Sequence, residues 1–183
     1  MTEMSGDDVD WRHGRAPLYV FHGSDAAHEV GRAAFMKYFS ENALGGRRAF
    51  FGLKRMEDEV VELGLDLFQA PDGAVGNMTT GGSESIFMAV KACRDWARTQ
   101  SHIKPPFNIV APFSAHAAFN KAADGMDMTV RRLPTGEDRR ADPDAMADAI
   151  DGGTIMVVGS APCFPHGVID SIAALSELAL ERD

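Results

Sequence analysis

A glycine-rich turn, Gly81-Gly82-Ser83-Glu84-Ser85, contains the residue types needed to hold an anion. Two glycines let the backbone turn sharply and approach a ligand with no Cβ in the way. The helix that we expect over residues 83–99 would offer unpaired N–H groups and the positive end of its dipole, which suit a phosphate group. Ser83 could add a hydroxyl donor. The alternative is a tight strand-to-helix connection in which Ser83 serves only as the N-cap.

His116 is the second residue that could do chemistry. An imidazole near the start of a helix, just after a strand, could stack on a flat aromatic ligand or donate a proton. Its neighbours Ala115, Ala117 and Ala118 are small and leave space for a ring. The alternative is a partly buried histidine that is hydrogen-bonded to the backbone.

A third segment, residues 160–166, contains a hydroxyl and a thiol. Ser160 and Cys163 could contact a substrate. The alternative for Cys163 is an inert small thiol in a proline-stiffened loop. Asn42, in an earlier loop, has no chemical context of its own.

Alternating helices and strands are expected to position these residues. Helical patterns cover residues 25–39 and 53–68. Strands are expected over 75–80, 107–111, 128–133 and 154–159, and helices over 83–99, 114–123 (with Ser114 as cap), 142–152 (starting at Asp142-Pro143) and after Asp170 as cap. This order predicts an α/β fold with a parallel sheet of about four strands, right-handed crossovers and helices on both faces. Residues 1–70 would form a helical arm and residues 71–183 a partial sheet domain.

The expected sheet places the candidate residues at one edge. Ligands of open parallel sheets bind at the carboxyl ends of the strands. The segments that contain Gly82, His116 and Ser160 each follow an expected strand, so they should face one crevice. The strand over residues 154–159 has the near-continuous apolar character of a strand buried on both faces. The sheet looks incomplete, because the last helix should lead into another strand and none follows.

Composition narrows the class of protein. The 183 residues are 45% hydrophobic and 25% charged, which indicates a globular domain with a core. The net charge of −9 and the lack of a basic face make nucleic acid an unexpected partner. Cys93 and Cys163 form no C-x-x-C pattern, so neither a disulfide framework nor a metal site is expected. No apolar run is long enough to span a membrane, and the acidic first ten residues do not fit a secretory signal, so we expect a cytoplasmic protein.

Four segments together resemble one family. Residues 77–85 (NMTTGGSES) resemble the segment that opens the cofactor site of group II decarboxylases and sphingosine-phosphate lyases, which use pyridoxal 5′-phosphate (PLP). Residues 115–123 (AHAAFNKAA) are similar to their cofactor-stacking histidine segment. Residues 159–170 (GSAPCFPHGVID) resemble a loop of the lyase branch, and residues 54–61 (KRMEDEVV) resemble the helix that precedes the domain. The order and spacing of all four agree from about Tyr19 to the end of the chain.

The resemblance implies a role for each candidate residue. Gly81, Gly82 and Ser83 would hold the PLP phosphate, mainly through backbone N–H groups. His116 would stack on the pyridine ring and help protonation. Ser160, Cys163 and Asn42 would lie on the substrate side, Asn42 in a segment that can wall the active site of a partner subunit.

The chain also departs from the family pattern. Asn42 is followed by Ala-Leu-Gly-Gly46 where the lyases usually have proline and histidine, and Phe51 stands where proline is common. The family's Schiff-base lysine and the aspartate that pairs with the pyridine nitrogen lie downstream of the last loop present here. No His-Lys pair occurs, and the five lysines stand in no comparable position.

The resemblance therefore implies a three-layer PLP-transferase-like large domain, present in its N-terminal portion. The expected activity is that of a PLP-dependent carbon–carbon lyase, either an amino-acid decarboxylase or a sphingosine-phosphate-lyase-like aldehyde lyase. It would act on a small amine or amino-acid substrate and form a homodimer when complete. Without the lysine, the chain alone is expected to be inactive. The alternative is a non-catalytic truncated or decayed homologue that binds at most phosphate ligands or a partner.

Overall fold

The chain divides into two compact units, residues 1–78 and 79–183. The computed structural model describes residues 8–13, 20–42 and 48–182. In the first unit these residues form a 3₁₀ helix, Trp11–His13, and two α-helices, α1 (Asp25–Lys37) and α2 (Phe51–Leu67). The hydroxyl of Ser24 caps α1 by accepting from the amide of Ala27 at 3.1 Å. Both helices fall where they were expected, while the boundary at residue 70 stays a prediction.

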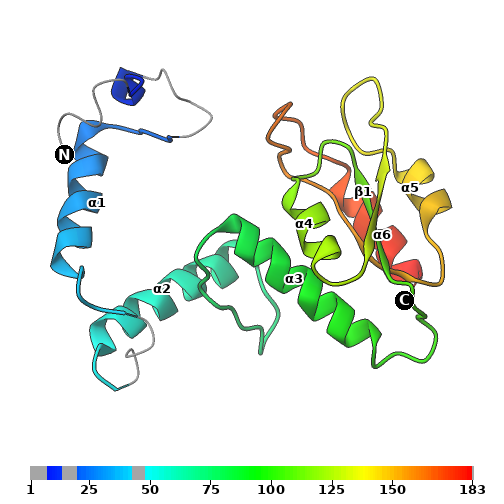
Figure 1. Ribbon diagram of the computed structural model, residues 1–183, viewed down its shortest axis with the longest axis horizontal. Coiled ribbons are helices and arrows are strands. Elements are labelled where there is room, and N and C mark those ends of the chain that lie inside the picture. The colour runs from blue at the N-terminus through cyan, green and yellow to red at the C-terminus, as the bar shows by residue number, and fades with distance from the viewer. Residues whose placement is uncertain (1–7, 14–19, 43–47, 183) are drawn as a thin grey trace. The chain divides into compact units, whose positions relative to one another are not determined.

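The second unit contains a parallel sheet flanked by helices (Figure 1). Its elements are α3 (Gly82–Ala97), β1 (Asn108–Pro112), α4 (Ala118–Asp124), β2 (Thr129–Leu133), α5 (Pro143–Ala149), β3 (Thr154–Val157) and α6 (Ile172–Glu181). The strands lie in the order β2-β1-β3, and both pairings are parallel. The predicted α/β class with a parallel sheet is confirmed.

Strand β1 is the centre of the core, and all five of its residues are buried. Successive side chains of a strand point to opposite faces. Ile109 and Ala111 accordingly pack in one cluster with residues of α3 and α4, whereas Val110 packs in a second cluster with Met146 and Leu175 of α5 and α6. The sheet is therefore the middle of three layers, and Figure 1 shows α4 and α5 on opposite sides of it.

Two expectations about the strands were wrong. Residues 75–80 form no strand, because no neighbouring strand pairs with them in the described part of the chain, and Val75 is exposed. The sheet therefore has three strands there, rather than about four. The strand buried on both faces is β1 and not β3, which lies at the edge of the sheet and is only partly buried.

Two of the three expected helix caps were also wrong. Asp142 caps α5 as predicted, since its carboxylate accepts from the amides of Asp144 and Ala145. Ser114 does not cap α4, which begins four residues later, at Ala118. Asp170 does not cap α6, because it accepts from amides elsewhere in the fold. None of the described helices is long and apolar enough to cross a membrane.

Candidate functional site

The connections of the sheet define where a ligand would bind. The segment after β1 leads to α4 on one face, and the segment after β3 leads to α6 on the other face. Adjacent strands whose connections leave toward opposite faces form a topological switch point, at which open α/β sheets bind their ligands. His116 follows β1 and Ser160 follows β3, so both predicted residues lie at the carboxyl ends of this strand pair.

Helix α3 starts toward the same edge. Its last turn leads into residues 98–107, and the amides of Lys104 and Asn108 bond the carbonyls of Gly152 and Gly153, just before β3. That end of α3 therefore lies at the amino-terminal edge of the sheet, and its first turn points toward the carboxyl edge, as Figure 1 shows. α3 also packs against α4, the helix that follows His116. No hydrogen bond joins His116 to the described residues of the glycine turn.

The turn that starts α3 depends on Gly81. Its backbone has φ 155° and ψ 173°, a conformation that essentially only glycine adopts. The turn is braced by its own side chains. Glu84 accepts from the amide and hydroxyl of Thr80 at 2.6 and 2.7 Å, and the hydroxyls of Thr79 and Ser85 lie 2.6 Å apart. The hydrogen bonds from Thr80 also lower the pKa of Glu84, which keeps that carboxylate ionised and directed back at Thr80.

This bracing leaves the start of α3 open to a ligand. Gly81 is the N-cap and has no side chain to cap the helix, and Ser83 makes no capping bond. The amides of Gly82, Ser83 and Glu84 consequently have no acceptor among the described residues. A Cβ added to Gly81 or Gly82 would meet nothing within 4 Å. The N-cap alternative for Ser83 is therefore wrong, and the residues present fit an anionic group such as the phosphate of PLP.

His116 has a defined ring orientation. Its Nδ1 accepts from the amide of Ala118, the first residue of α4, at 3.0 Å. Because Nδ1 is the acceptor, the neutral ring carries its proton on Nε2, and that donor faces away from this bond. The alternative of a backbone-bonded histidine holds in part, since the bond is present but the residue is exposed. The ring can therefore meet a ligand without giving up its anchor.

Arg132 is a residue of this region that sequence reasoning missed. It lies on β2 opposite Ala111 of β1, and its guanidinium bonds the segment that contains His116. Burial lowers the pKa of this guanidinium. The sequence shows only an arginine in an expected strand, so the sole signal for a role in the site was its position near the carboxyl end of that strand.

The segment after β3 depends on Asp170. This aspartate is 3% exposed, and its carboxylate accepts from the amides of Ala141 and Ser160 at 2.8 and 2.7 Å. Ser160 is half-buried and thus fixed in place by its backbone. Cys163 is 1% exposed, so its thiol lies in the interior, which fits the alternative of an inert packed cysteine. Its role on the substrate side stays a prediction.

Ser114 and Asn42 belong to different units of the chain. Ser114 is buried in the segment after β1, and its hydroxyl has no hydrogen-bond partner among the described residues. An unpaired buried hydroxyl is costly, so Ser114 is a strained point of this segment and not a donor that an outside ligand can reach. Asn42 is exposed and belongs to the first unit, and the Ala-Leu-Gly-Gly46 segment after it lies outside the described residues.

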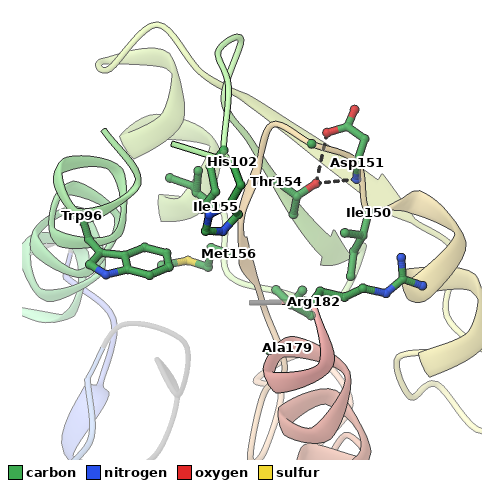
Figure 2. A pocket seen from close by; sticks show the side chains of 12 residues that line it. Trp96, His102, Ile150, Asp151, Thr154, Ile155, Met156, Ala179 and Arg182 are labelled. Atoms are coloured by element: carbon green, nitrogen blue, oxygen red, sulfur yellow. Dashed lines mark hydrogen bonds between the residues drawn. The ribbon is translucent and has the colours of Figure 1, made fainter. Parts of the chain in front are cut away.

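A pocket of about 150 Å³ lies elsewhere, along the outer edge of β3 (Figure 2). Trp96 of α3 and Met156 of β3 both line it, and Arg182 reaches it from the end of α6. None of the predicted site residues lines it. We place the candidate site at the switch point instead, because His116 and Ser160 lie there and α3 starts toward the same edge, whereas this pocket follows an unpaired strand edge.

A parallel sheet between two helical layers, with an uncapped glycine turn at its carboxyl edge, is the architecture of the large domain of PLP-transferase-like enzymes. Within that class the chain is homologous to the N-terminal portion of the sphingosine-1-phosphate lyase and group II decarboxylase family, whose members are PLP-dependent lyases.

Three relatives show this homology. The chain is 41% identical to sphingosine-1-phosphate lyase 1 of Rattus norvegicus over 99% of its own length and 31% of the relative's. It is 37% identical to a probable L-tyrosine/L-aspartate decarboxylase of Methanosarcina acetivorans, over 80% of the chain and 40% of that protein. The solved sphingosine-1-phosphate lyase of Burkholderia pseudomallei matches with a TM-score of 0.80 and 36% identity, over 88% of the chain and 38% of that structure. No protein-family model matches. The chain thus spans about a third of the length of the curated lyases that it matches.

Proposed function

We propose that this chain forms the phosphate- and ring-binding part of a PLP-dependent carbon–carbon lyase. The three open amides at the start of α3 are the observation that carries the proposal, since they have no acceptor among the described residues, and a Cβ built on Gly81 or Gly82 meets nothing within 4 Å. The homology to sphingosine-1-phosphate lyases over nearly the whole chain supports an aldehyde lyase more than a decarboxylase. The substrate class that follows is a phosphorylated amino alcohol. A homodimer and a cytoplasmic location stay predictions.

Each residue of the site has a distinct task in this proposal. The amides of Gly82 and Ser83, with the Ser83 hydroxyl, would bind the phosphate through the positive end of α3. His116 would lie against the pyridine ring and present an Nε2–H that can donate a hydrogen bond. Ser160 would border the substrate. When bound, PLP supplies the electron sink on which bond cleavage at the substrate's α-carbon depends.

Titration of the 183-residue chain with PLP tests the proposal. Binding should change the absorbance of PLP, and inorganic phosphate should compete with it for the amides of α3. His116→Ala should weaken PLP but leave the affinity for inorganic phosphate unchanged, because the imidazole contacts the ring alone. A chain that binds neither ligand, or a phosphate site that competition maps away from PLP, would overturn the assignment.

Borohydride treatment separates the catalytic from the non-catalytic alternative for this polypeptide. The non-catalytic alternative is favoured by the absence of a His-Lys pair. Under this alternative PLP forms no imine with a lysine of the chain, so bound PLP can still be removed by dialysis after borohydride treatment. A stable reduced adduct mapped to one of the five lysines would contradict it.

A further inference from the structure

We propose that Arg132 is the positioning residue for His116, and that it fixes the loop which presents the imidazole to PLP. This inference rests on the proposed function and names a residue of that same site. It is drawn from the way in which one side chain of β2 bonds both ends of the segment between β1 and α4.

The guanidinium of Arg132 uses all five of its N–H donors on this segment and on the helix that follows it, α4. Nη1 donates to the carbonyls of Pro112 and Ala115, both at 2.8 Å. Nη2 donates to the carbonyl of His116 at 3.1 Å and to Oδ1 of Asn120 at 2.5 Å, and Nε donates to the same Oδ1 at 3.0 Å. An arginine has five such donors in a rigid planar fork, so none is left over.

These bonds define the geometry of the segment rather than neutralise a charge. No carboxylate pairs with Arg132 in the described part of the chain, and its acceptors are three backbone carbonyls and one amide oxygen. The carbonyls belong to the last residue of β1, to the residue before His116 and to His116 itself. The imidazole is held separately, through Nδ1, by the amide of Ala118. Residue 116 is therefore fixed at its backbone by β2 and at its ring by α4.

The chain offers a matched control in the preceding residue. Arg131 lies on the same strand and points to the other face, where it bonds the Ala149 carbonyl and Asp151. Arg131→Gln removes the same charge from the same strand without touching the His116 segment. Asn120 offers a milder perturbation from α4, since Asn120→Ala removes two of the five acceptor contacts and Asn120→Asp keeps both.

The first measurement is amide hydrogen exchange at Ala118, which reports the His116 anchor and needs no ligand. Arg132→Gln should speed exchange at this amide about tenfold, because the segment loses its hold on residue 116. Arg131→Gln and Asn120→Asp should leave it within about twofold of the wild-type rate, and Asn120→Ala should fall between. Unchanged exchange in Arg132→Gln, with the protein folded, overturns the inference. If that variant does not fold, Asn120→Ala decides in its place.

The second measurement is a double-mutant cycle on PLP affinity and on the circular dichroism of bound PLP. Arg132→Gln should weaken PLP about tenfold and reduce its induced signal in the wild-type background, but change affinity less than about twofold in a His116→Ala background. A purely structural loss would weaken binding equally in both backgrounds and overturn the inference. If wild-type chain binds no PLP, the proposed function fails, and exchange at Ala118 still decides whether Arg132 positions His116.

Discussion

Replacing each glycine of the α3 turn by alanine should separate backbone conformation from ligand space. Gly81 has φ 155°, which a side chain disfavours, while a Cβ at this position would meet nothing within 4 Å. The cost of Gly81→Ala is therefore conformational and not steric. Forcing a non-glycine residue into such a region costs about 1–3 kcal/mol. Turning the peptide over to avoid it would sacrifice the bond from the Ser85 amide to the Gly81 carbonyl, worth about 1 kcal/mol.

Gly82→Ala should have the opposite effect on stability. Gly82 is the first residue of α3, and its added Cβ would also meet nothing. Alanine at a compatible position stabilises by about 0.4–1 kcal/mol, chiefly through the unfolded chain. The added methyl group would nevertheless occupy space at the first turn of α3, where the phosphate is proposed to bind. We therefore expect Gly82→Ala to bind PLP and inorganic phosphate about tenfold more weakly while unfolding at higher urea.

Urea unfolding and phosphate titration of three variants form the assay. Gly64→Ala is the control, because Gly64 lies inside α2 with open space around it and should gain stability with no change in phosphate affinity. The reasoning is refuted if Gly81→Ala unfolds at the same urea concentration as wild type. It is refuted separately if Gly82→Ala keeps full phosphate affinity, because the phosphate would then not lie against the first turn of α3.

Three further changes test the framework around the site. Asp170→Ala should cost about 3 kcal/mol or more in urea unfolding, because the amides of buried Ala141 and half-buried Ser160 lose their charged acceptor, and a loss under 1 kcal/mol would contradict this. Hydrogen bonds from a β1 asparagine and a backbone amide lower the pKa of Asp151 to about 2, so its stabilising effect should be present above the unfolded pKa and be lost as pH falls from about 4 to 2. Because this carboxylate is 46% exposed, we expect only about 1 kcal/mol, visible as a flatter acid-unfolding curve in Asp151→Asn. Gly153→Ala should destabilise by more than about 2 kcal/mol, since its Cβ would lie 2.4 Å from a backbone carbonyl oxygen, and near-wild-type thermal unfolding would be the contrary result.

Most of the local structure of the second unit could be predicted from the sequence. Periodicity and breakers located every strand of the sheet to within two residues, because short apolar runs between glycine, proline and helix caps have few other solutions. The strand predicted over residues 75–80 does not form, for a reason that no local pattern reveals, since a strand exists only where a partner strand pairs with it. The same holds for the choice of the central strand. The run at 154–159 is as apolar as β1, and only the order β2-β1-β3 decides which one is covered on both sides.

The site was predictable where it depends on local chemistry and not where it depends on distant pairs. The glycine turn and His116 are visible as motifs because helix starts and strand ends have characteristic residues. Arg132 bonds residues 12 to 20 positions earlier, and Asp170 bonds residues 10 and 29 positions earlier. Such bonds require the register of the sheet, so a charged residue of this kind looks like an ordinary surface residue or a helix cap in the sequence.

Arg132 and Asp170 together explain how two irregular segments at the carboxyl ends of β1 and β3 can hold a defined shape. Each is a charged side chain that bonds backbone groups of a segment at the switch point, and neither forms an ion pair among the described residues. A charge satisfied by several backbone groups imposes one loop conformation, whereas an ion pair would fix only a distance between two side chains. The segments after β1 and β3 are thus shaped by the protein itself, which keeps the ordering cost out of the binding step. The open amides of α3, the imidazole of residue 116 and the backbone of Ser160 are then in place before any cofactor arrives.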